Sequence, residues 1–385
     1  MLGAIIGDIV GSRFESWKNN ILSKDFSLFS SECIFTDDSV MTLATAEACI
    51  AGFDHEGQKF DEIKFVSDTY KKWCREFPDR RYGNRTRLWY NSDAVISPQL
   101  SYANGAAMRI SPVAWFSGTL KQTQEKAKFL SEITHDNEGV KGAQAIASAL
   151  YLAIKRDGED FPHKKERSSK EDIKKYIETL YGYNLSISLS EADKVYRHRK
   201  PTRSQASKSV PAAILAFLNG TDYEDVIRTA ISLGGDSDTI AAMAGGIAEA
   251  YYGIPENIKT QISNYMTTDL LDKVLMFERE RFRFNSGKYL QARNAAMNVY
   301  GISRDYSLIT DFGPSGWQNY FDYNESENDQ DKRNFWSDVV FWTNYFYRNN
   351  FVKKHAKLNE ELDDYSCLKI YPSNSENTKY LVSSI

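Results

Sequence analysis

The stretch from Gly234 to Tyr252, which reads GGDSDTIAAMAGGIAEAYY, is the part of the chain on which the expected fold depends. It begins with two carboxylates and two hydroxyls, and it continues as a helical pattern with very few large side chains. A glycine inside a helix costs about 1 kcal/mol relative to alanine. Two such glycines indicate the close approach of a neighbouring helix, so we expect Thr239–Tyr252 to be a central helix that holds the acidic cluster rigidly.

Around this stretch, the first three quarters of the chain repeat apolar residues at a spacing of about 3.6, which predicts helices. Such patterns occupy residues 1–10, 41–51, 60–77, 139–154, 210–218 and 223–233. No long stretch alternates apolar and polar residues, as a half-buried strand would. We therefore expect an all-α fold.

The composition is that of an ordinary globular enzyme. The chain has 385 residues, of which 42% are hydrophobic, and its net charge of −4 gives no support to general affinity for nucleic acid or membranes. Asp8 interrupts the apolar N-terminal run, which has no basic flank, so a buried helix is favoured over a signal peptide or membrane span. The four cysteines show no CxxC spacing, which predicts neither zinc nor disulfides and favours a cytoplasmic location.

Composition also predicts where the chain divides. From about residue 284 the sequence becomes rich in aromatic residues and asparagine, so we expect a catalytic domain over 1–283 and an added module of unknown fold over 284–385. Within that module, Asn334–Phe351 reads as one aromatic helix. The charge-dense segment Asp157–Lys175 reads as a solvated excursion that ends in a helix.

Two acidic clusters carry the first chemical hypothesis. One is Thr36-Asp37-Asp38-Ser39 and the other is Asp236-Ser237-Asp238-Thr239. Carboxylate and hydroxyl oxygens without Cys or His are the ligands of a hard cation such as Mg²⁺ or Mn²⁺. Either cluster alone could simply stabilise a helix N-terminus, with Asp38 or Ser39 as the N-cap of the helix expected over Met41–Ala51. If the fold brings both together, four carboxylates share one small volume, which is hard to explain without metal.

Four further segments could contribute to catalysis or substrate binding, and each also has an ordinary structural explanation. Glu15 follows Gly7-Asp8 by seven residues, and spacing alone favours a surface glutamate. The turn from Ser101 to Gly105 enters a helix and suits a phosphate, although most such turns only cap. His135 could hydrogen-bond a ribose hydroxyl or phosphate oxygen, or it could be a capping or core histidine. The basic segment Val195–Ser209 could bind a phosphate-bearing substrate or partner, or it could be a solvated loop.

Read in order, these blocks resemble the ADP-ribosylglycohydrolase family, which contains dinitrogenase-reductase-activating glycohydrolase and the ADP-ribosyl-acceptor hydrolases. The resemblance runs from Gly3 to about Arg283 and rests on five ordered blocks. They are Gly7-Asp8 to Glu15, the Thr36 cluster, Ser101 to Pro112, Thr134-His135, and Gly234 to Thr239.

The resemblance implies an all-α orthogonal multi-helix bundle with two Mg²⁺ ions at its centre, for which Mn²⁺ is an alternative. By match of position, the metal ligands would be Thr36, Asp37, Asp38, Asp236, Asp238 and Thr239. Glu15 would gate the site or activate water, so the residues expected to be catalytic are Glu15, Asp37, Asp38 and Asp238. The ADP-ribose would be held by Ser101, Tyr102, Asn104, Gly105 and His135.

The implied reaction is hydrolysis of the bond between ADP-ribose and an acceptor, with ADP-ribosyl-arginine on a modified protein as the first expectation. Serine-linked ADP-ribose, O-acetyl-ADP-ribose and nucleic-acid-linked ADP-ribose stay open. So do an inactive member that binds ADP-ribose or a partner, and a phosphohydrolase acting on nucleotides. One departure from the family pattern is Ala103, which stands where glycine is usual and could tighten the turn.

Overall fold

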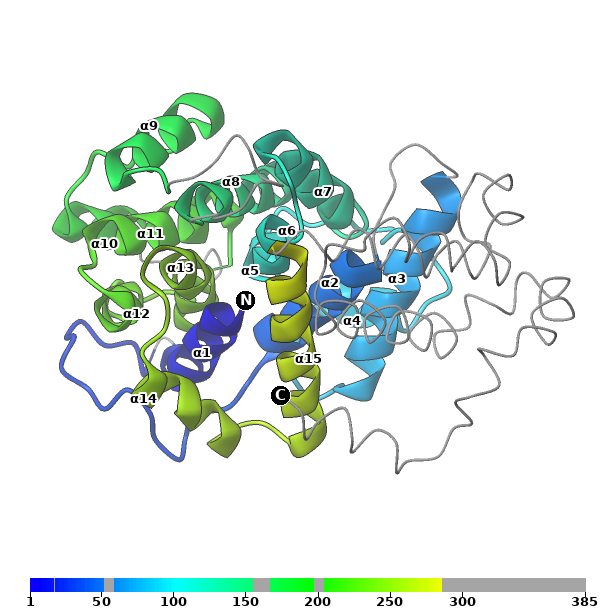
Figure 1. Ribbon diagram of the computed structural model, residues 1–385, viewed down its shortest axis with the longest axis horizontal. Coiled ribbons are helices and arrows are strands. Elements are labelled where there is room, and N and C mark those ends of the chain that lie inside the picture. Colours follow the sequence, from blue (N-terminus) through cyan, green and yellow to red (C-terminus); the bar gives the residue numbers. More distant parts are fainter. Residues whose placement is uncertain (17, 52–58, 155–166, 197–203, 286–385) are drawn as a thin grey trace, which may run out of the picture. The chain divides into compact units, whose positions relative to one another are not determined.

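The computed structural model describes residues 1–16, 18–51, 59–154, 167–196 and 204–285 of the chain. They belong to one compact unit, Met1–Asn285 (Figure 1). The helices are α1 (Leu2–Gly11), η1 (Ser12–Phe14), α2 (Asp37–Ala51), α3 (Lys59–Glu76), α4 (Asn84–Tyr90), α5 (Gly105–Met108), α6 (Ser111–Trp115), α7 (Leu120–Glu132), α8 (Asn137–Ala153), α9 (Lys170–Tyr181), α10 (Leu189–Tyr196), α11 (Ala206–Asn219), α12 (Tyr223–Ser232), α13 (Ser237–Tyr252), α14 (Glu256–Lys259), η2 (Thr260–Asn264) and α15 (Thr268–Asn285). Within these residues only two isolated β-bridges occur, so the predicted all-α class is confirmed.

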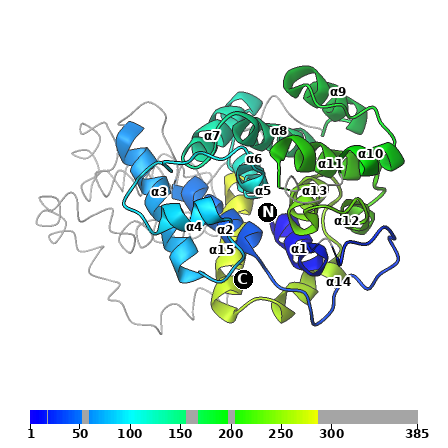
Figure 2. The same ribbon diagram turned by 180° about the vertical axis from the view of Figure 1, so that it is seen from behind.

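Helix α13 is the centre of the bundle, as its small side chains predicted. Every residue from Ser237 to Glu249 is buried. Its principal partner is α1, which is itself buried from end to end, and α11, α12 and α8 pack around it (Figures 1 and 2).

Glycines let α1 lie directly against the backbone of α13. Gly3, Gly7 and Gly11 are spaced by four and therefore share one face of α1. A Cβ added to Gly7 would overlap the carbonyl oxygen of Ala241, and one added to Gly11 would lie 2.6 Å from the Cα of Asp238. This contact explains how α13 tolerates its own central glycines, since Gly245 meets the backbone of Gly3.

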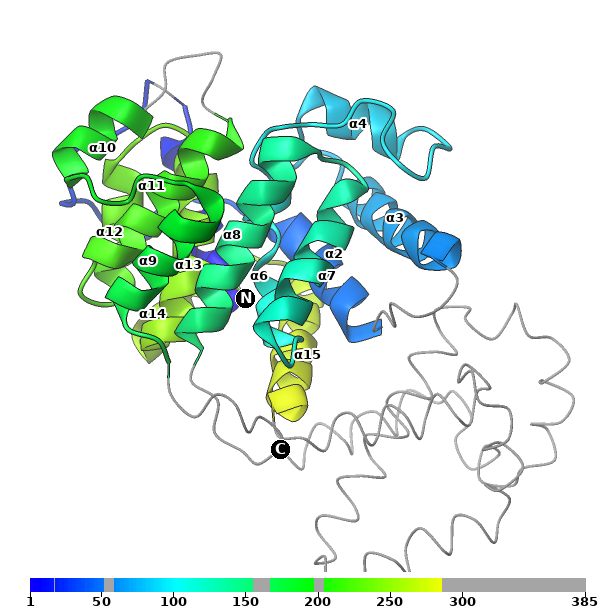
Figure 3. The same ribbon diagram turned by 90° about the horizontal axis from the view of Figure 1, so that it is seen from above.

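The remaining helices enclose this pair. Helices α7 and α8 lie side by side, and α2 packs on both α1 and α3 (Figure 3). Helix α15, which the sequence did not predict, packs against α2 and α6. Its Arg281 pairs with the buried Glu249 of α13 and lies over the ring of Trp115.

The start of α2 differs from its prediction. The apolar pattern begins at Met41, whereas the helix begins at Asp37. The proposed N-cap role of Asp38 or Ser39 is therefore wrong, because both lie inside the first turn. The carboxylate of Asp8 accepts the backbone N–H groups of Thr36 and Ser39 and so satisfies donors that a capping side chain would otherwise serve.

Several predictions fall on parts of the chain that the structure does not describe. The proposed C-terminal module 284–385 with its Asn334–Phe351 helix lies outside the described residues, apart from residues 284 and 285 at the end of α15. The same holds for most of the charge-dense excursion and for residues 197–203 of the basic segment. In the described part, no helix is both long enough and apolar enough to cross a membrane.

Candidate metal centre and substrate loop

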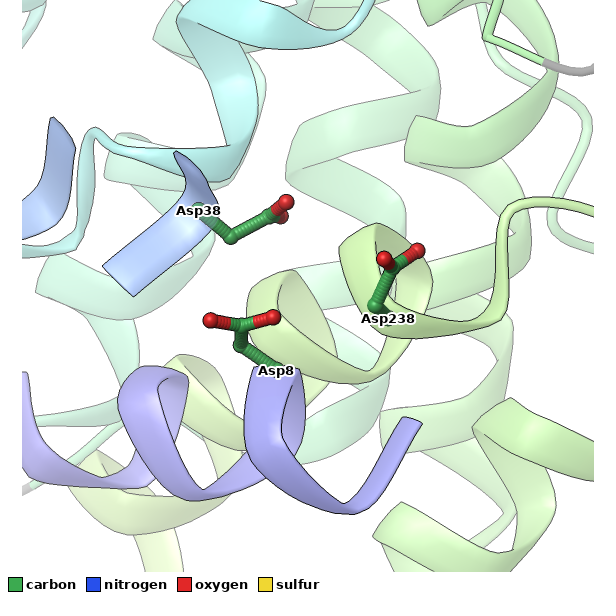
Figure 4. A group of neighbouring side chains, drawn as sticks. All are labelled: Asp8, Asp38 and Asp238. Atoms are coloured by element: carbon green, nitrogen blue, oxygen red, sulfur yellow. The ribbon is translucent and has the colours of Figure 1, made fainter. Parts of the chain in front are cut away.

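Three helices bring the acidic clusters together. Asp8 lies on α1, Asp38 in the first turn of α2 and Asp238 in the first turn of α13. Their carboxylates point toward one another, as Figure 4 shows. The close contact of α1 with α13 places Asp8 here, because Asp238 stands beside Gly11 at one end of that contact.

The carboxylates form two overlapping groups. In the first, oxygens of Asp8, Asp38 and Asp238 all lie within 4.8 Å of one another. In the second, the same holds for Glu15, Asp236 and Asp238. Asp238 belongs to both, so the two groups are adjacent and together contain five acidic residues.

Asp8 was noted in the sequence only as part of a motif, and it was not assigned to the site. The structure shows that it organises the start of α2. Its Oδ1 accepts the Thr36 hydroxyl at 2.6 Å, and its Oδ2 accepts the backbone N–H of Thr36 at 2.8 Å and that of Ser39 at 3.1 Å. The Ser39 hydroxyl also donates to Oδ2. Because these bonds use most of its acceptor capacity, Asp8 chiefly fixes Thr36 and Ser39, which flank Asp38 in the chain.

Burial and mutual repulsion dominate the electrostatics of the site. Asp38 and Asp238 are almost completely buried, at 2% and 3% exposure. Burial raises the pKa of Asp38 well above its usual value, and the charges of Asp8 and Asp238 raise it further. Burial likewise raises the pKa of Asp238, followed by the charges of Glu15 and Asp236. Like charges at this spacing favour a compensating proton or cation.

The donor set fits a hard divalent cation. Oδ1 of Asp38 is buried and has no hydrogen-bond partner among the described residues, which is costly unless a ligand satisfies it. Thr36 donates its hydroxyl proton to Asp8, and the Thr239 hydroxyl lies 3.3 Å from Asp38 Oδ2. A hydroxyl that donates to a carboxylate keeps a lone pair for a cation. The site therefore offers only oxygen ligands, as Mg²⁺ and Mn²⁺ prefer.

Asp37 lies beside these groups but belongs to neither of them. It is only partly buried, at the first position of α2. Burial raises its pKa well above the usual value, with the charge of Asp8 as the next cause. Its predicted role as a ligand and catalytic residue stays a prediction.

Glu15 is not the isolated surface residue that its spacing favoured. It follows η1 directly and belongs to the second carboxylate group. Its Oε2 accepts a hydrogen bond from Arg81 Nη1 at 2.8 Å. Arg81 is a contact that sequence reasoning missed, because no local pattern connects residues 66 positions apart.

The Ser101–Gly105 turn contacts the second carboxylate group. Asn104 provides the link, since its Nδ2 donates to Asp236 Oδ2 at 2.8 Å and to the Ser209 hydroxyl at 3.0 Å. Ser101 pairs with His135 in an isolated parallel bridge, and Gly105 lies beside the His135 ring. The structure thus places Asn104 against the acidic groups, and it brings Ser101, Gly105 and His135 together.

Tyr102, the fifth, projects outward with 52% of its surface exposed. The guanidinium carbon of Arg85 lies 5.8 Å from the centre of its ring. Because half of its surface is exposed, the Tyr102 ring is accessible to a ligand.

His135 is buried and neutral. Burial lowers its pKa well below the usual value, and the charges of Arg109 and Arg85 lower it further. Its Nδ1 lies 2.8 Å from the Thr134 hydroxyl, which also accepts a hydrogen bond from Arg109 at 2.7 Å. A neutral imidazole can bond a hydroxyl or phosphate oxygen without adding a charge.

Ala103 does not strain the turn. Among the described non-glycine residues, only Arg81 and Asn137 have a positive φ, so Ala103 needs no glycine-like conformation. It forms an antiparallel bridge with Gln205. Alanine therefore fits this position without backbone strain, and its effect on the N–H groups of the turn stays a prediction.

Comparison with known proteins identifies relatives of this architecture. Residues 1–283 match the family model described as ADP-ribosylglycohydrolase. ADP-ribosylhydrolase ARH3 of Homo sapiens is 27% identical over 345 residues, which cover 71% of this chain and 91% of that protein. The ADP-ribosylarginine hydrolase Tri1 of Pseudomonas putida is 26% identical over 278 residues, covering 66% of this chain and 70% of that protein.

A solved structure described as an ADP-ribosylglycohydrolase-related protein complex is also similar. It is 22% identical, with a TM-score of 0.48, and the match covers 74% of this chain and 95% of that one.

Proposed function

This chain belongs to the ADP-ribosylglycohydrolase family, and from that premise we propose that it is a magnesium-dependent enzyme that releases ADP-ribose from ADP-ribosyl-arginine on a modified protein. Membership and the hydrolase relatives make it a hydrolase of ADP-ribosyl glycosidic bonds. The metal, the acceptor and the residue roles are the parts that we propose.

The observation that carries the proposal is the pair of carboxylate groups sharing Asp238. Two adjacent groups suit two cations, one held by Asp38 and Asp238 with the Thr36 and Thr239 hydroxyls, the other by Glu15, Asp236 and Asp238. Mn²⁺ would fit the same oxygen ligands. Bound there, the metals would supply Lewis-acid polarisation of ribose oxygens and a nucleophilic water.

The carboxylates of the chain would also stabilise the transition state. Cleavage at the anomeric carbon develops positive charge on the ribose, and buried carboxylates nearby oppose that charge. Glu15 is the least buried of the five acidic residues in the two groups, so it is our candidate to accept the proton of the attacking water. Asp37, at the edge of the groups, would serve as a further ligand.

His135 would hold the sugar-phosphate part of the substrate as a hydrogen-bond donor. Arg109 donates to the Thr134 hydroxyl, which can in turn donate a hydrogen bond to Nδ1 of His135. Nε2 then carries the imidazole proton and faces Gly105, where a ligand oxygen would accept it. Ser101, Tyr102, Asn104 and Gly105 complete this side, and exposed Tyr102 is placed to contact the ADP part.

Arginine is proposed as the acceptor because Tri1, a relative of similar identity, is named an ADP-ribosylarginine hydrolase. Serine-linked, O-acetyl- and nucleic-acid-linked ADP-ribose are the competing substrates. The free thiols of Cys33, Cys49 and Cys74 support a reducing, cytoplasmic compartment.

A substrate panel tests the proposal. ADP-ribosylated arginine, serine and nucleic-acid substrates are incubated with the full-length protein, with Mg²⁺ or with EDTA, and released ADP-ribose is measured by chromatography. We expect release from the arginine substrate only with Mg²⁺. Activity that survives EDTA refutes the metal mechanism, binding without release indicates an inactive member, and free phosphate as product indicates a phosphohydrolase.

A further inference from the structure

Arg81 occupies an unusual place in the segment that joins α3 to α4. Its neighbours on both sides are anchored. The Arg80 guanidinium lies 3.7 Å from the centre of the Phe35 ring, and the buried Tyr82 packs edge-on against Tyr90 at 5.6 Å. The side chains on both sides of Arg81 therefore help to fix the path of this segment.

The backbone of Arg81 is held in a conformation that large residues avoid. Its φ of 63° lies in the left-handed region, which costs a non-glycine residue roughly 1 kcal/mol or more. Such strain persists where surrounding contacts determine it, and it concentrates at functional sites.

The side chain of Arg81 is hydrogen-bonded to the turn that precedes Glu15 and to Glu15 itself. Its Nη1 donates to the carbonyl oxygen of Ser12 at 2.9 Å and to Oε2 of Glu15 at 2.8 Å. Ser12 begins η1 and Glu15 follows it, so one guanidinium holds both ends of this short turn.

The chain that follows Glu15 is hydrogen-bonded, through Asn20, to the residue that precedes the second acidic cluster. Asn20 Oδ1 accepts the backbone N–H of Gly235 at 2.8 Å, and its Nδ2 donates to the Gly235 carbonyl at 3.3 Å. Glu15 therefore has the Arg81 guanidinium as one neighbour and the carboxylates of Asp236 and Asp238 as the others.

We propose that Arg81 is a positioning residue that competes with a divalent cation for Glu15. The guanidinium neutralises Glu15 and holds it against the Ser12–Phe14 turn, which lowers the affinity of the Glu15, Asp236 and Asp238 group for metal. Because Glu15 has a second charged partner, it can leave the metal without becoming an unpaired charge. The inference rests on the proposed function only in requiring that this group binds a cation.

Mn²⁺ binding to the metal-free, full-length protein tests this without any substrate. Free Mn²⁺ is measured by electron paramagnetic resonance during titration of wild type, Arg81→Ala, Arg81→Gln and Arg81→Lys. Arg80→Ala is the matched control, because Arg80 is the adjacent arginine and stacks on Phe35 instead. Thermal unfolding of each protein verifies that it folds.

Removing one positive charge a few ångströms from a bound cation should tighten its binding by about tenfold. We therefore expect about tenfold tighter Mn²⁺ binding in Arg81→Ala and Arg81→Gln, and wild-type affinity in Arg81→Lys and Arg80→Ala. Unchanged or weaker binding in both neutral variants overturns the inference. Arg81→Gln keeps a side chain able to donate hydrogen bonds, so the result does not depend on Arg81→Ala alone.

The kinetic consequence separates positioning from simple folding support. Arg81→Ala should lower kcat for ADP-ribose release by about tenfold with little change in KM, because Glu15 would then stay bound to the cation and lose the position that Arg81 gives it. Arg81→Lys should recover part of kcat. If wild type releases no ADP-ribose but the Mn²⁺ affinities shift as expected, the proposed function fails and the inference stands.

Discussion

At the scale of single residues, Asp238 joins the two carboxylate groups of the site. Asp238→Asn keeps the size of the side chain and removes one negative charge from both groups. We expect kcat/KM for ADP-ribose release to fall by about 100-fold or more, since interactions of this kind act directly on transition-state charge. Chromatographic measurement of ADP-ribose checks the value. Asp93→Asn, at an exposed aspartate, serves as the control, and equal losses in both variants would contradict the assignment.

The raised pKa values of Asp38 and Asp238 predict how stability depends on pH. In the unfolded chain these carboxyls titrate near pH 4, whereas burial and neighbouring carboxylates raise their pKa values in the folded protein. The folded protein then binds more protons above about pH 4, so its free energy of unfolding falls as pH rises through that range.

In the proposed metal site, a divalent cation would replace those protons. Without metal, the melting temperature should therefore fall as the pH rises above about 4, and the gain on adding Mg²⁺ should grow in the same direction. Thermal unfolding in EDTA and in Mg²⁺ measures both. The double variant Asp38→Asn, Asp238→Asn should show a weaker pH dependence. A wild-type melting temperature that rises with pH in EDTA, at the same slope in the variant, would contradict the prediction.

At the scale of elements, the contact of α1 with α13 supports both the fold and the site. Gly7 has no room for a methyl group, because a Cβ there would lie 2.1 Å from the Ala241 carbonyl oxygen. Gly7→Ala should therefore lower the free energy of unfolding by about 2 kcal/mol or more, as overpacking of a rigid contact does. Chemical denaturation measures the change.

Gly83→Ala is the control for this effect, since no atom lies within 4 Å of a Cβ at Gly83 and its φ is −61°. We expect a change within about 1 kcal/mol there. Because Gly11 of α1 meets Asp238 of α13, Gly7→Ala should also weaken Mg²⁺ binding. Full stability of Gly7→Ala would show that the two helices can separate without cost.

At the scale of the whole molecule, the described core and the family match end near the same place, at Asn285 and residue 283. We therefore expect a chain shortened to residues 1–285 to fold cooperatively and to release ADP-ribose with kcat within about threefold of the full chain, since each domain carries its own core. Unfolding curves and the substrate panel measure this. Loss of folding would assign the rest of the chain to the core, and a changed acceptor preference would assign it to recognition.

The local sequence was enough to predict most of the long helices and the two acidic clusters. Helical periodicity placed α3, α8, α11, α12 and α13 to within a few residues, because apolar spacing and capping are properties of neighbouring residues. The carboxylates and hydroxyls of the sequence marked both acidic clusters, and the two glycines inside α13 predicted that a neighbouring helix would lie close to it. Helix α15 was missed, and the start of α2 was placed too late, since Asp8 supplies from a distance what a local cap would supply.

Only the tertiary structure decided which of these groups meet. The glycines of α1 let its backbone touch α13, and that contact brings Asp8 beside Asp38 and Asp238. The same packing sets Glu15 between Arg81 and the second acidic cluster. Spacing along the chain carries no information about such pairs, because a contact across 66 or more residues depends on how helices pack and not on their local order.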